Sequence, residues 1–357
     1  MSGPSDSELI ARCLADYDLG TVTAWRRHGG TAGRTWRVAT AAGTWLLRMR
    51  GIRTSTDAIV TFDHALRRYL VERAVPTAVP VPTRHGGTFI RHDGRTFEVY
   101  PFVEGTTLEA ADSAALAQIT AALALFHRVA AGFPAARTLP PVSQYSTVGV
   151  PAESDRMEDP ELLVEVYRRL AAEPGAVQFS SAISLCERWL QRLRTEFGRE
   201  TYGGLPHTVT HGDYTLANLL FAADGRVNGI FDLDWARWAP RVRDLADGML
   251  SIAGARRSPL RPGDIWSLAE ATALQVERCV LWLRTYHQVA PLTAAEVSAV
   301  PLAAAARWLS IRVEGTAKVP AADRLRFAFG NVTVPLLWFE ENWPAVVRGL
   351  ALPAVPR

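Results

Sequence analysis

The sequence is almost without lysine. Lys318 is the single lysine among 39 basic side chains, and the others are arginine. Any function that needs a side-chain cation in the first three hundred residues must therefore rely on arginine, or on histidine when it is protonated. The formal net charge is +3. This surplus is too small to indicate a nucleic-acid partner, so we expect none.

Cysteine is also scarce. Cys13, Cys186 and Cys279 lie far apart and form no CxxC pair, which argues against a disulfide framework or a zinc site and fits a reducing cytoplasm. The first twenty residues lack the basic and apolar segments of a signal peptide. The chain also has no apolar run of about 18 residues or more, so we expect no membrane span. We predict a cytoplasmic protein that is a monomer or a homodimer.

The first hundred residues have short apolar and β-branched runs separated by glycines. An Asp93-Gly94 turn signal indicates a hairpin between residues 89 and 102. Apolar residues at helical spacing predict helices over 6–18 and 57–74. We therefore predict that residues 1–101 form a small antiparallel sheet with two helices, whose other strands are Thr21–Arg26, Thr35–Ala39 and Trp45–Met49.

After residue 101 the pattern becomes mainly helical, with one β-loop-β stretch at 207–234 and a long Pro-, Ser- and Ala-rich loop at 133–158. The fold class predicted is α+β, with a bilobed chain divided into 1–101 and 102–357. The helices expected in the larger lobe span residues 112–131, 160–172, 179–198, 241–254, 263–289, 293–314 and 321–346.

The residues that indicate chemistry lie in that β-loop-β stretch. His211-Gly-Asp213 is followed five residues later by Asn218, and Asp232 comes after a further apolar run. Phosphoryl transfer needs oxygen ligands for metal ions and a group that accepts the proton of the acceptor hydroxyl. Asn218 and Asp232 offer the hard oxygen ligands that Mg²⁺ prefers, and Asp213 can act as the base. His211 is expected to orient the loop.

This pattern resembles the H-x-D-x-x-x-x-N loop of protein kinases followed by their metal-binding aspartate. In its H-G-D form, with Ile230-Phe-Asp-Leu-Asp234 after it, it is most similar to the aminoglycoside phosphotransferase and choline kinase superfamily. The resemblance implies a protein-kinase-like fold and a soluble kinase. It also implies Mg²⁺ as cofactor, ATP or GTP as phosphoryl donor, and a small hydroxylated acceptor.

The resemblance extends to the predicted nucleotide-binding lobe. The loop with Gly30, Thr31 and Gly33 is similar to a phosphate-binding loop, although it lacks a full GxGxxG and a plain glycine hairpin is the alternative. Arg48 stands where protein kinases have their strand lysine, with Asp63 as its expected helix partner; the alternative is a solvent-exposed arginine. Tyr100-Pro-Phe102 resembles the hinge that binds adenine. Asp244, in Arg243-Asp244-Leu-Ala, is expected to be structural.

The acceptor is less constrained by the sequence. Carboxylates beside aromatic rings can bind an amine-bearing acceptor, although core tryptophans and a solvated acidic helix face are the stronger interpretation of the C-terminal segment. An antibiotic or amino-sugar-like acceptor is favoured over homoserine or choline. Asp234 either contacts a second metal or caps a turn, and the latter is favoured. The candidate acceptor residues are Tyr214, Asp234, Trp235, Trp238, Glu340 and Glu341.

Three other hypotheses compete with the small-molecule kinase. A stress-type Ser/Thr protein kinase would share the same motifs. A non-catalytic nucleotide-binding module is disfavoured because Asp213, Asn218 and Asp232 are all present. A metal-dependent hydrolase is disfavoured because such sites usually gather more histidines.

Overall fold

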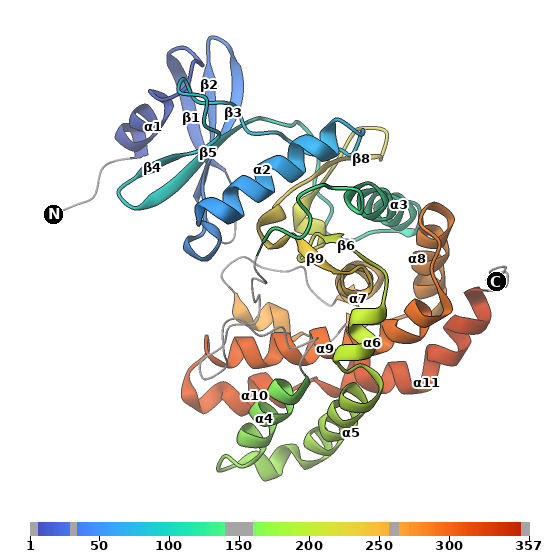
Figure 1. Ribbon diagram of the computed structural model, residues 1–357. Coiled ribbons are helices and arrows are strands. Elements are labelled where there is room, and N and C mark those ends of the chain that lie inside the picture. Colours follow the sequence, from blue (N-terminus) through green and yellow to red (C-terminus); the bar gives the residue numbers. More distant parts are fainter. Residues whose placement is uncertain (1–5, 29–33, 140–159, 257–263, 271, 351–357) are drawn as a thin grey trace.

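The computed structural model describes residues 6–28, 34–139, 160–256, 264–270 and 272–350. A small, mainly β lobe comes first in the chain, and a larger lobe built of helices follows (Figure 1). This arrangement confirms the predicted α+β fold class. The exact boundary at residue 101 stays a prediction, although the first sheet does end at Pro101.

The first lobe contains a five-stranded antiparallel sheet in the order β1-β2-β3-β5-β4. Alternation along β2 buries Trp36 and Val38, and along β5 it helps to bury Phe97 and Val99, so one face packs against helix α1 in a compact apolar cluster. The elements are α1 (Asp6–Leu14), β1 (Val22–His28), β2 (Arg34–Thr40), β3 (Gly43–Met49), β4 (Ile90–His92) and β5 (Arg95–Pro101).

Helix α2 (Asp57–Val71) connects the two lobes. The Thr56 side chain caps its first turn by accepting the Ile59 amide. Its apolar residues Phe62, Leu66 and Leu70 belong to the core cluster of the larger lobe rather than to the cluster under the sheet. Figure 1 shows α2 running from the sheet toward α3 and β8. The helix therefore fixes the position of the sheet on the larger lobe.

The larger lobe packs its helices around one extended apolar core. Helix α3 (Ser113–Ala130) is long and apolar enough to cross a membrane by length and composition, but it packs against α8 and β6 in this core, as a core helix does. The other helices are α4 (Pro160–Ala171), α5 (Ser180–Glu196), α6 (Arg199–Gly204), α7 (Val242–Gly248), α8 (Val276–Val289), α9 (Ala294–Thr316), α10 (Arg324–Phe329) and α11 (Thr333–Leu350).

Two short strand pairs interrupt these helices and hold the loops of interest. β6 (His207–Thr210) pairs with β9 (Arg237–Pro240), and β7 (Leu219–Phe221) pairs with β8 (Val227–Ile230). A third pair, β10 (Ala255–Arg256) with β11 (Thr272–Ala273), lies farther along the chain.

Three helix predictions were wrong in extent, and the first of them, expected over 6–18, ends at Leu14. The helix expected over 263–289 begins only at Val276, because Thr272 and Ala273 pair with β10 instead. The helix expected over 321–346 is divided into α10 and α11. Asn331, between them, has φ of +56°, a left-handed conformation that ends a right-handed helix. Most of the predicted 133–158 loop lies outside the described residues.

Candidate active site

Helix α7 holds the loop His211–Asp213 in place. Asp244, in the first turn of α7, accepts hydrogen bonds from the backbone amides of His211 and Gly212, the second at 2.9 Å. His127 of α3 contacts the same carboxylate at 2.9 Å. Burial alone would raise the pKa of Asp244, but the hydrogen bonds and the charge of His127 lower it. The carboxylate is therefore kept ionised as the acceptor that shapes this loop.

The His211 ring fixes the loop from the other side. Its Nε2 lies 2.8 Å from the Phe231 carbonyl, and its Nδ1 accepts the Asp213 amide at 3.2 Å. Both contacts are satisfied when Nε2 carries the proton. Burial lowers the pKa of this histidine, so the neutral form is favoured. His211 therefore joins the Asp213 loop to the strand that leads to Asp232.

Asp213 and Asn218 contact each other directly. The Asn218 Nδ2 donates to the Asp213 carbonyl at 2.8 Å and to its carboxylate at 3.1 Å. Because the amide nitrogen is used in this way, the amide oxygen of Asn218 is left as an acceptor. Burial and the negative charge of Asp247 raise the pKa of Asp213 to about 6, while Arg307 and Asn218 oppose them.

Strand pairing brings Asp232 next to Asn218. Leu219 pairs with Ile230, and the Phe231 amide donates to the Asn218 carbonyl at 2.9 Å. Asp232 then adopts φ of +60°, an uncommon conformation for a residue with a side chain, of the kind that gathers at functional sites. Burial raises the pKa of Asp232 to about 6 against the opposing charge of Arg48. Asn218 and Asp232 fit a hard divalent cation because both present oxygen ligands at one place.

Arg48 of β3 reaches this loop from the first lobe. Its guanidinium lies 2.9 Å from Asp232 and grips Asp234 with two bonds, at 2.8 and 2.9 Å. Asp234 also accepts the Thr54 hydroxyl at 2.8 Å and lies 3.0 Å from Arg50. Burial opposes these cations, which nevertheless lower the pKa of Asp234 to about 2. The prediction that Asp234 caps a turn is therefore wrong, because it joins the two lobes instead.

The predicted ion pair between Arg48 and Asp63 is also wrong. Asp63 of α2 binds Arg50 at 2.7 Å and Arg67 at 2.6 Å. Glu98 of β5, opposite Arg48 in the sheet register, lies 2.8 Å from Arg50 and 3.7 Å from Arg48. Arg50 is fully buried, whereas the side chain of Arg48 is 13% exposed. Arg50 thus occupies the structural position, and Arg48 is directed at the metal-ligand candidates.

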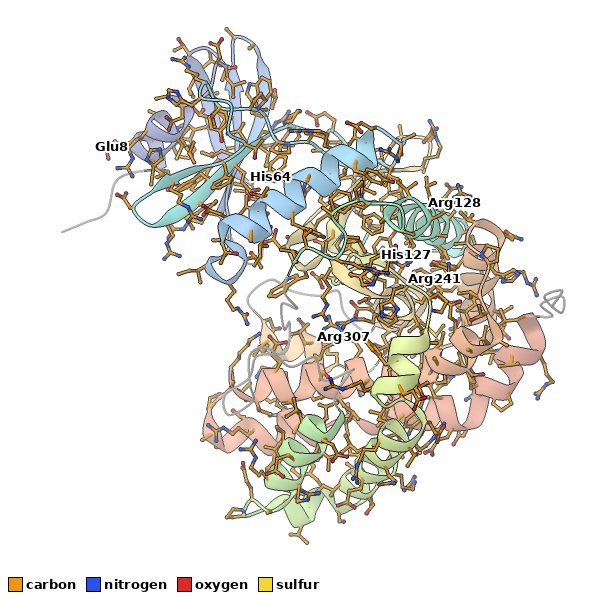
Figure 2. The ribbon with its side chains drawn as sticks, viewed as in Figure 1. Glu8, His64, His127, Arg128, Arg241 and Arg307 are labelled. Carbon is orange, nitrogen blue, oxygen red and sulfur yellow. The ribbon has the colours of Figure 1, made fainter. Side chains whose placement is uncertain are left out.

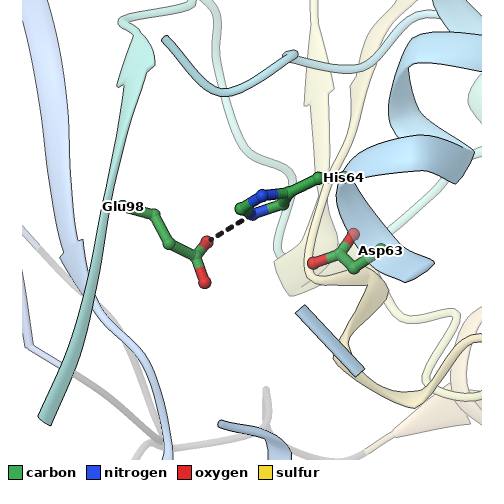
Figure 3. A group of neighbouring side chains, drawn as sticks. All are labelled: Asp63, His64 and Glu98. Atoms are coloured by element: carbon green, nitrogen blue, oxygen red, sulfur yellow. Dashed lines mark ion pairs between the residues drawn. The ribbon is translucent and has the colours of Figure 1, made fainter. Parts of the chain in front are cut away.

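His64 completes this buried cluster. Figure 3 shows Asp63 and His64 of α2 near Glu98, with His64 and Glu98 3.5 Å apart. Two carboxylates and an imidazole so close together resemble a metal site. The Tyr100 hydroxyl also donates to Glu98. Since Arg50 and Arg67 already neutralise the carboxylates, we interpret the cluster as an ionic network that holds α2 on the sheet.

The nucleotide-loop candidates are only partly described. Gly30, Thr31 and Gly33 lie outside the described residues. Tyr100 is a buried member of the ionic network. Phe102 donates its backbone amide to the Thr44 carbonyl at 3.0 Å, and Arg37 lies over its ring at 4.3 Å. A nucleotide base would therefore have to use other backbone groups of the hinge.

The acceptor candidates are not brought together. Tyr214 is fully buried and donates to the Ile119 carbonyl at 2.8 Å, and Trp238 stacks on His207. Glu340, on α11, lies 3.7 Å from Arg188 of α5, and Glu341 is exposed on the same helix. Asp234 and Trp235 lie in the metal-ligand loop; Asp234 is bound by Arg48, and Arg53 lies 5.8 Å from the Trp235 ring.

Four charged residues at or beside the site were not predicted from the sequence: Arg50, Glu98, Asp247 and Arg307. The alternation of β-strands offered a signal for Arg50, since residues 48 and 50 point to the same side. Asp247 stands one helical turn after Asp244, which also was a usable signal. No local pattern identifies Arg307, because only the packing of α9 on α7 brings it near the loop.

The comparison with known proteins agrees with this geometry. A sequence model of the phosphotransferase enzyme family (APH) matches residues 24–292, which include both Arg48 and the Asp213–Asp232 loops. The chain belongs to the phosphotransferase enzyme family. The resemblance found in the motifs is thereby confirmed. This phosphotransferase is a small-molecule kinase that transfers a phosphoryl group to a hydroxyl.

Individual relatives are distant in sequence. The phosphotransferase is 26% identical to a homoserine kinase of Parvibaculum lavamentivorans over 86% of this chain and 85% of that protein. An aminoglycoside phosphotransferase from Alicyclobacillus acidocaldarius has a similar fold, with a TM-score of 0.66, 16% identity and 98% of each chain covered. An amicoumacin kinase in complex with AMP-PNP and Ca²⁺ gives a TM-score of 0.62, 12% identity and 93% coverage of each chain.

Proposed function

We propose that this kinase transfers the γ-phosphoryl group of ATP or GTP to the hydroxyl of homoserine or of a similarly small amino alcohol. Asp213 accepts the hydroxyl proton, and Asn218 and Asp232 hold Mg²⁺. The observation that carries the proposal is the direct contact of Asn218 with Asp213, beside the strand pairing that places Asp232 next to Asn218. Base and metal ligands thus converge at one place.

Asp213 is suited to the role of base. With a pKa of about 6 it is ionised at neutral pH, and it is a stronger base than an ordinary carboxylate. Asn218 and His211 fix its position through its carboxylate, carbonyl and amide. A bound Mg²⁺ ion would supply charge neutralisation for the phosphates. The protein's own part is to orient the hydroxyl and to receive its proton.

Arg48 is proposed to hold the phosphates. Among the described residues of the first lobe, Arg48 contacts both Asp232 and Asp234, and it is less deeply buried than Arg50. Its planar fork can bind two phosphate oxygens while Arg50 keeps Asp234 in place. The nucleotide itself is proposed from the AMP-PNP complex of the amicoumacin kinase with a similar fold.

The acceptor proposal comes from the curated relatives. Proteins 23–26% identical over most of both chains are named homoserine kinases. The antibiotic acceptor that the sequence alone favoured ranks second, because the structures of antibiotic kinases match at 16% identity or less and show the fold alone. Incubation with Mg·ATP or Mg·GTP and a panel of homoserine, choline and aminoglycosides, read by mass, separates these proposals. Transfer to an aminoglycoside and not to homoserine would overturn the first.

Removing the base should abolish transfer without abolishing nucleotide binding. We expect Asp213→Asn to lower kcat by roughly 10²- to 10⁴-fold, because general-base assistance and the orientation of the hydroxyl are lost. Steady-state kinetics and nucleotide titration measure the two effects. Asp224→Asn, in the exposed β7–β8 turn, is the matched control and should change neither. Full activity of Asp213→Asn would remove Asp213 from the mechanism.

A further inference from the structure

Helix α9 leaves one narrow stripe uncovered. Between Ala299 and Gly315, Arg307, Ile311 and Glu314 are partly exposed, and all other residues are buried. Positions i, i+4 and i+7 share one helix face, and they span about 10 Å along the axis. Along this stripe, in the C-terminal half of α9, the described residues of the lobe cover the helix incompletely.

Both ends of this α9 stripe face parts of the active site. The Arg307 Nε donates to the Asp247 carboxylate of α7 at 2.9 Å, and Nη2 makes a longer contact at 3.5 Å. At the other end, Glu314 lies 3.9 Å from Arg53 of the first lobe, whose guanidinium stands 5.8 Å from the Trp235 ring. The stripe therefore extends from α7 to the loop that follows Asp232.

The Arg307 end lies beside the catalytic loop. Ser251 donates to the Asp247 carbonyl at 2.7 Å and to the carbonyl of Tyr214, the residue after Asp213, at 3.3 Å. The charges of Asp247 and Arg307 both act on Asp213, the first raising its pKa and the second lowering it. Figure 2 shows Arg307 between α9 and the central strands and helix α7. The pair therefore lies beside the loop that carries Asp213.

We propose that Arg307 and Asp247 form the acceptor recognition site, with Arg307 binding a carboxylate and Asp247 an ammonium group of an amino-acid acceptor. The inference rests on the proposed function, and it deepens it by naming the residues that select the substrate class. An α-amino acid carries both charges on one carbon, a few ångströms from each other, and Arg307 and Asp247 present the opposite charges at a similar separation. A guanidinium binds carboxylate in a planar, two-bond geometry.

The Arg307 and Asp247 side chains lie in direct ionic contact. Both are mostly buried, with side-chain exposures of 14% for Arg307 and 9% for Asp247, so an unpaired charge there would be costly. A zwitterion offers an opposite charge to each of the two side chains, whereas an acceptor with a single charge offers one to only one of them. The pair would therefore select zwitterions over amines or acids of the same size.

Three acceptors separate recognition from structure. Homoserine carries both charges, 3-aminopropan-1-ol is the same chain without the carboxylate, and 4-hydroxybutyrate is the same chain without the ammonium group. We expect Arg307→Gln to lower kcat/KM for homoserine on the order of 100-fold, mainly through KM, and to change it less than about three-fold for 3-aminopropan-1-ol. Asp247→Asn should lower kcat/KM for homoserine and for 3-aminopropan-1-ol but leave kcat/KM for 4-hydroxybutyrate unchanged. Arg192→Gln, which breaks an exposed ion pair within α5, is the matched control.

The outcomes are distinguishable. If Arg307→Gln lowers kcat/KM for homoserine and for 3-aminopropan-1-ol by the same factor, the pair is a structural link between α7 and α9. The inference is then wrong, while the proposed function stands. If the wild type phosphorylates none of the three acceptors but modifies another alcohol, both the homoserine proposal and this inference are wrong. Should Arg307→Gln fail to fold, the ratio of kcat/KM for homoserine to kcat/KM for 3-aminopropan-1-ol is measured in Arg307→Lys, which retains the charge.

Discussion

Arg48 and Arg50 stand two residues apart at the end of one strand, so their side chains leave the sheet on the same side. They share Glu98 and Asp234, yet they have different surroundings. Arg50 is enclosed by Asp63, Glu98 and the Thr54 carbonyl, and none of its side chain is exposed. Arg48 binds the loop that contains the metal-ligand candidates. We therefore propose that Arg50 has the structural role and Arg48 the phosphate-binding role.

This division can be tested with two substitutions. We expect Arg48→Ala to raise the KM for nucleotide at least about ten-fold with little loss of stability, because a charge-assisted phosphate contact is removed. Arg50→Ala should instead lower the free energy of unfolding by about 3–5 kcal/mol, since it leaves buried carboxylates without their partner. Nucleotide titration and urea unfolding measure both effects. Arg27→Ala, on β1 at an exposed ion pair, is the control. Equal nucleotide affinity in wild type and Arg48→Ala would contradict the assignment.

At the scale of elements, α7 does more than carry Asp244. It presents Asp244 to the catalytic loop and Asp247 to α9 on successive turns, so its placement fixes both parts of the site. That placement depends on close packing against α8. The buried Trp282 ring lies against Gly248, and its indole donates to the Leu245 carbonyl at 3.1 Å. This contact leaves no room for a side chain larger than the hydrogen atom of glycine.

A single methyl group at this contact should displace α7. A Cβ at Gly248 would lie 2.4 Å from the Trp282 ring, so we expect Gly248→Ala to destabilise the protein by about 1–3 kcal/mol and to lower kcat. Gly203→Ala in α6, where a Cβ meets nothing within 4 Å, is the matched control and should be neutral or slightly stabilising. Thermal unfolding and steady-state kinetics are the measurements. Equal stability of the two variants would mean that α7 is not held by this packing.

At the scale of the whole molecule, buried charges and a shared core couple the two lobes. Helix α2 contributes Phe62 and Leu66 to the core of the larger lobe and Asp63 to the network under the sheet. Asp234 joins the metal-ligand loop to Arg48, Arg50 and Thr54 of the first lobe. Because these contacts cross between lobes, local changes in protonation are expected to affect global stability.

The global stability should depend on the protonation of His211. Burial lowers the pKa of His211 in the folded state below that of the unfolded chain, about 6.5. The unfolded state then binds the proton more readily, so stability falls as pH decreases below about 6.5, by at most about 1.4 kcal/mol per pH unit for this group. Urea unfolding is measured between about pH 5 and 8, a range that brackets the pKa of an unperturbed histidine. The slope of the free energy of unfolding against pH should be smaller in His211→Gln than in wild type. Parallel slopes would assign the pH dependence to other groups.

Much of the fold follows from local signals. Glycine-bounded apolar runs located the strands of the first sheet, and helical periodicity located α2, α3, α5 and α9. The break between α10 and α11 was missed because Gly330-Asn331 can also occur inside an apolar helical pattern, and only the left-handed conformation of Asn331 marks the end. The acceptor candidates failed for a related reason: composition cannot distinguish a buried Tyr214 from an exposed one.

The sequence by itself determined the family and its chemistry, because the spacing of His211, Asp213 and Asn218 within one loop, and Asp232 after the next strand, is local and independent of the rest of the chain. Tertiary structure alone decided which arginine faces which carboxylate. Arg48 and Arg50 are equivalent by alternation, and Asp63, Glu98 and Asp234 come from three different elements. Likewise, Arg307 approaches Asp247 only because α9 packs on α7. Long-range packing sets such distances, and no local pattern encodes them.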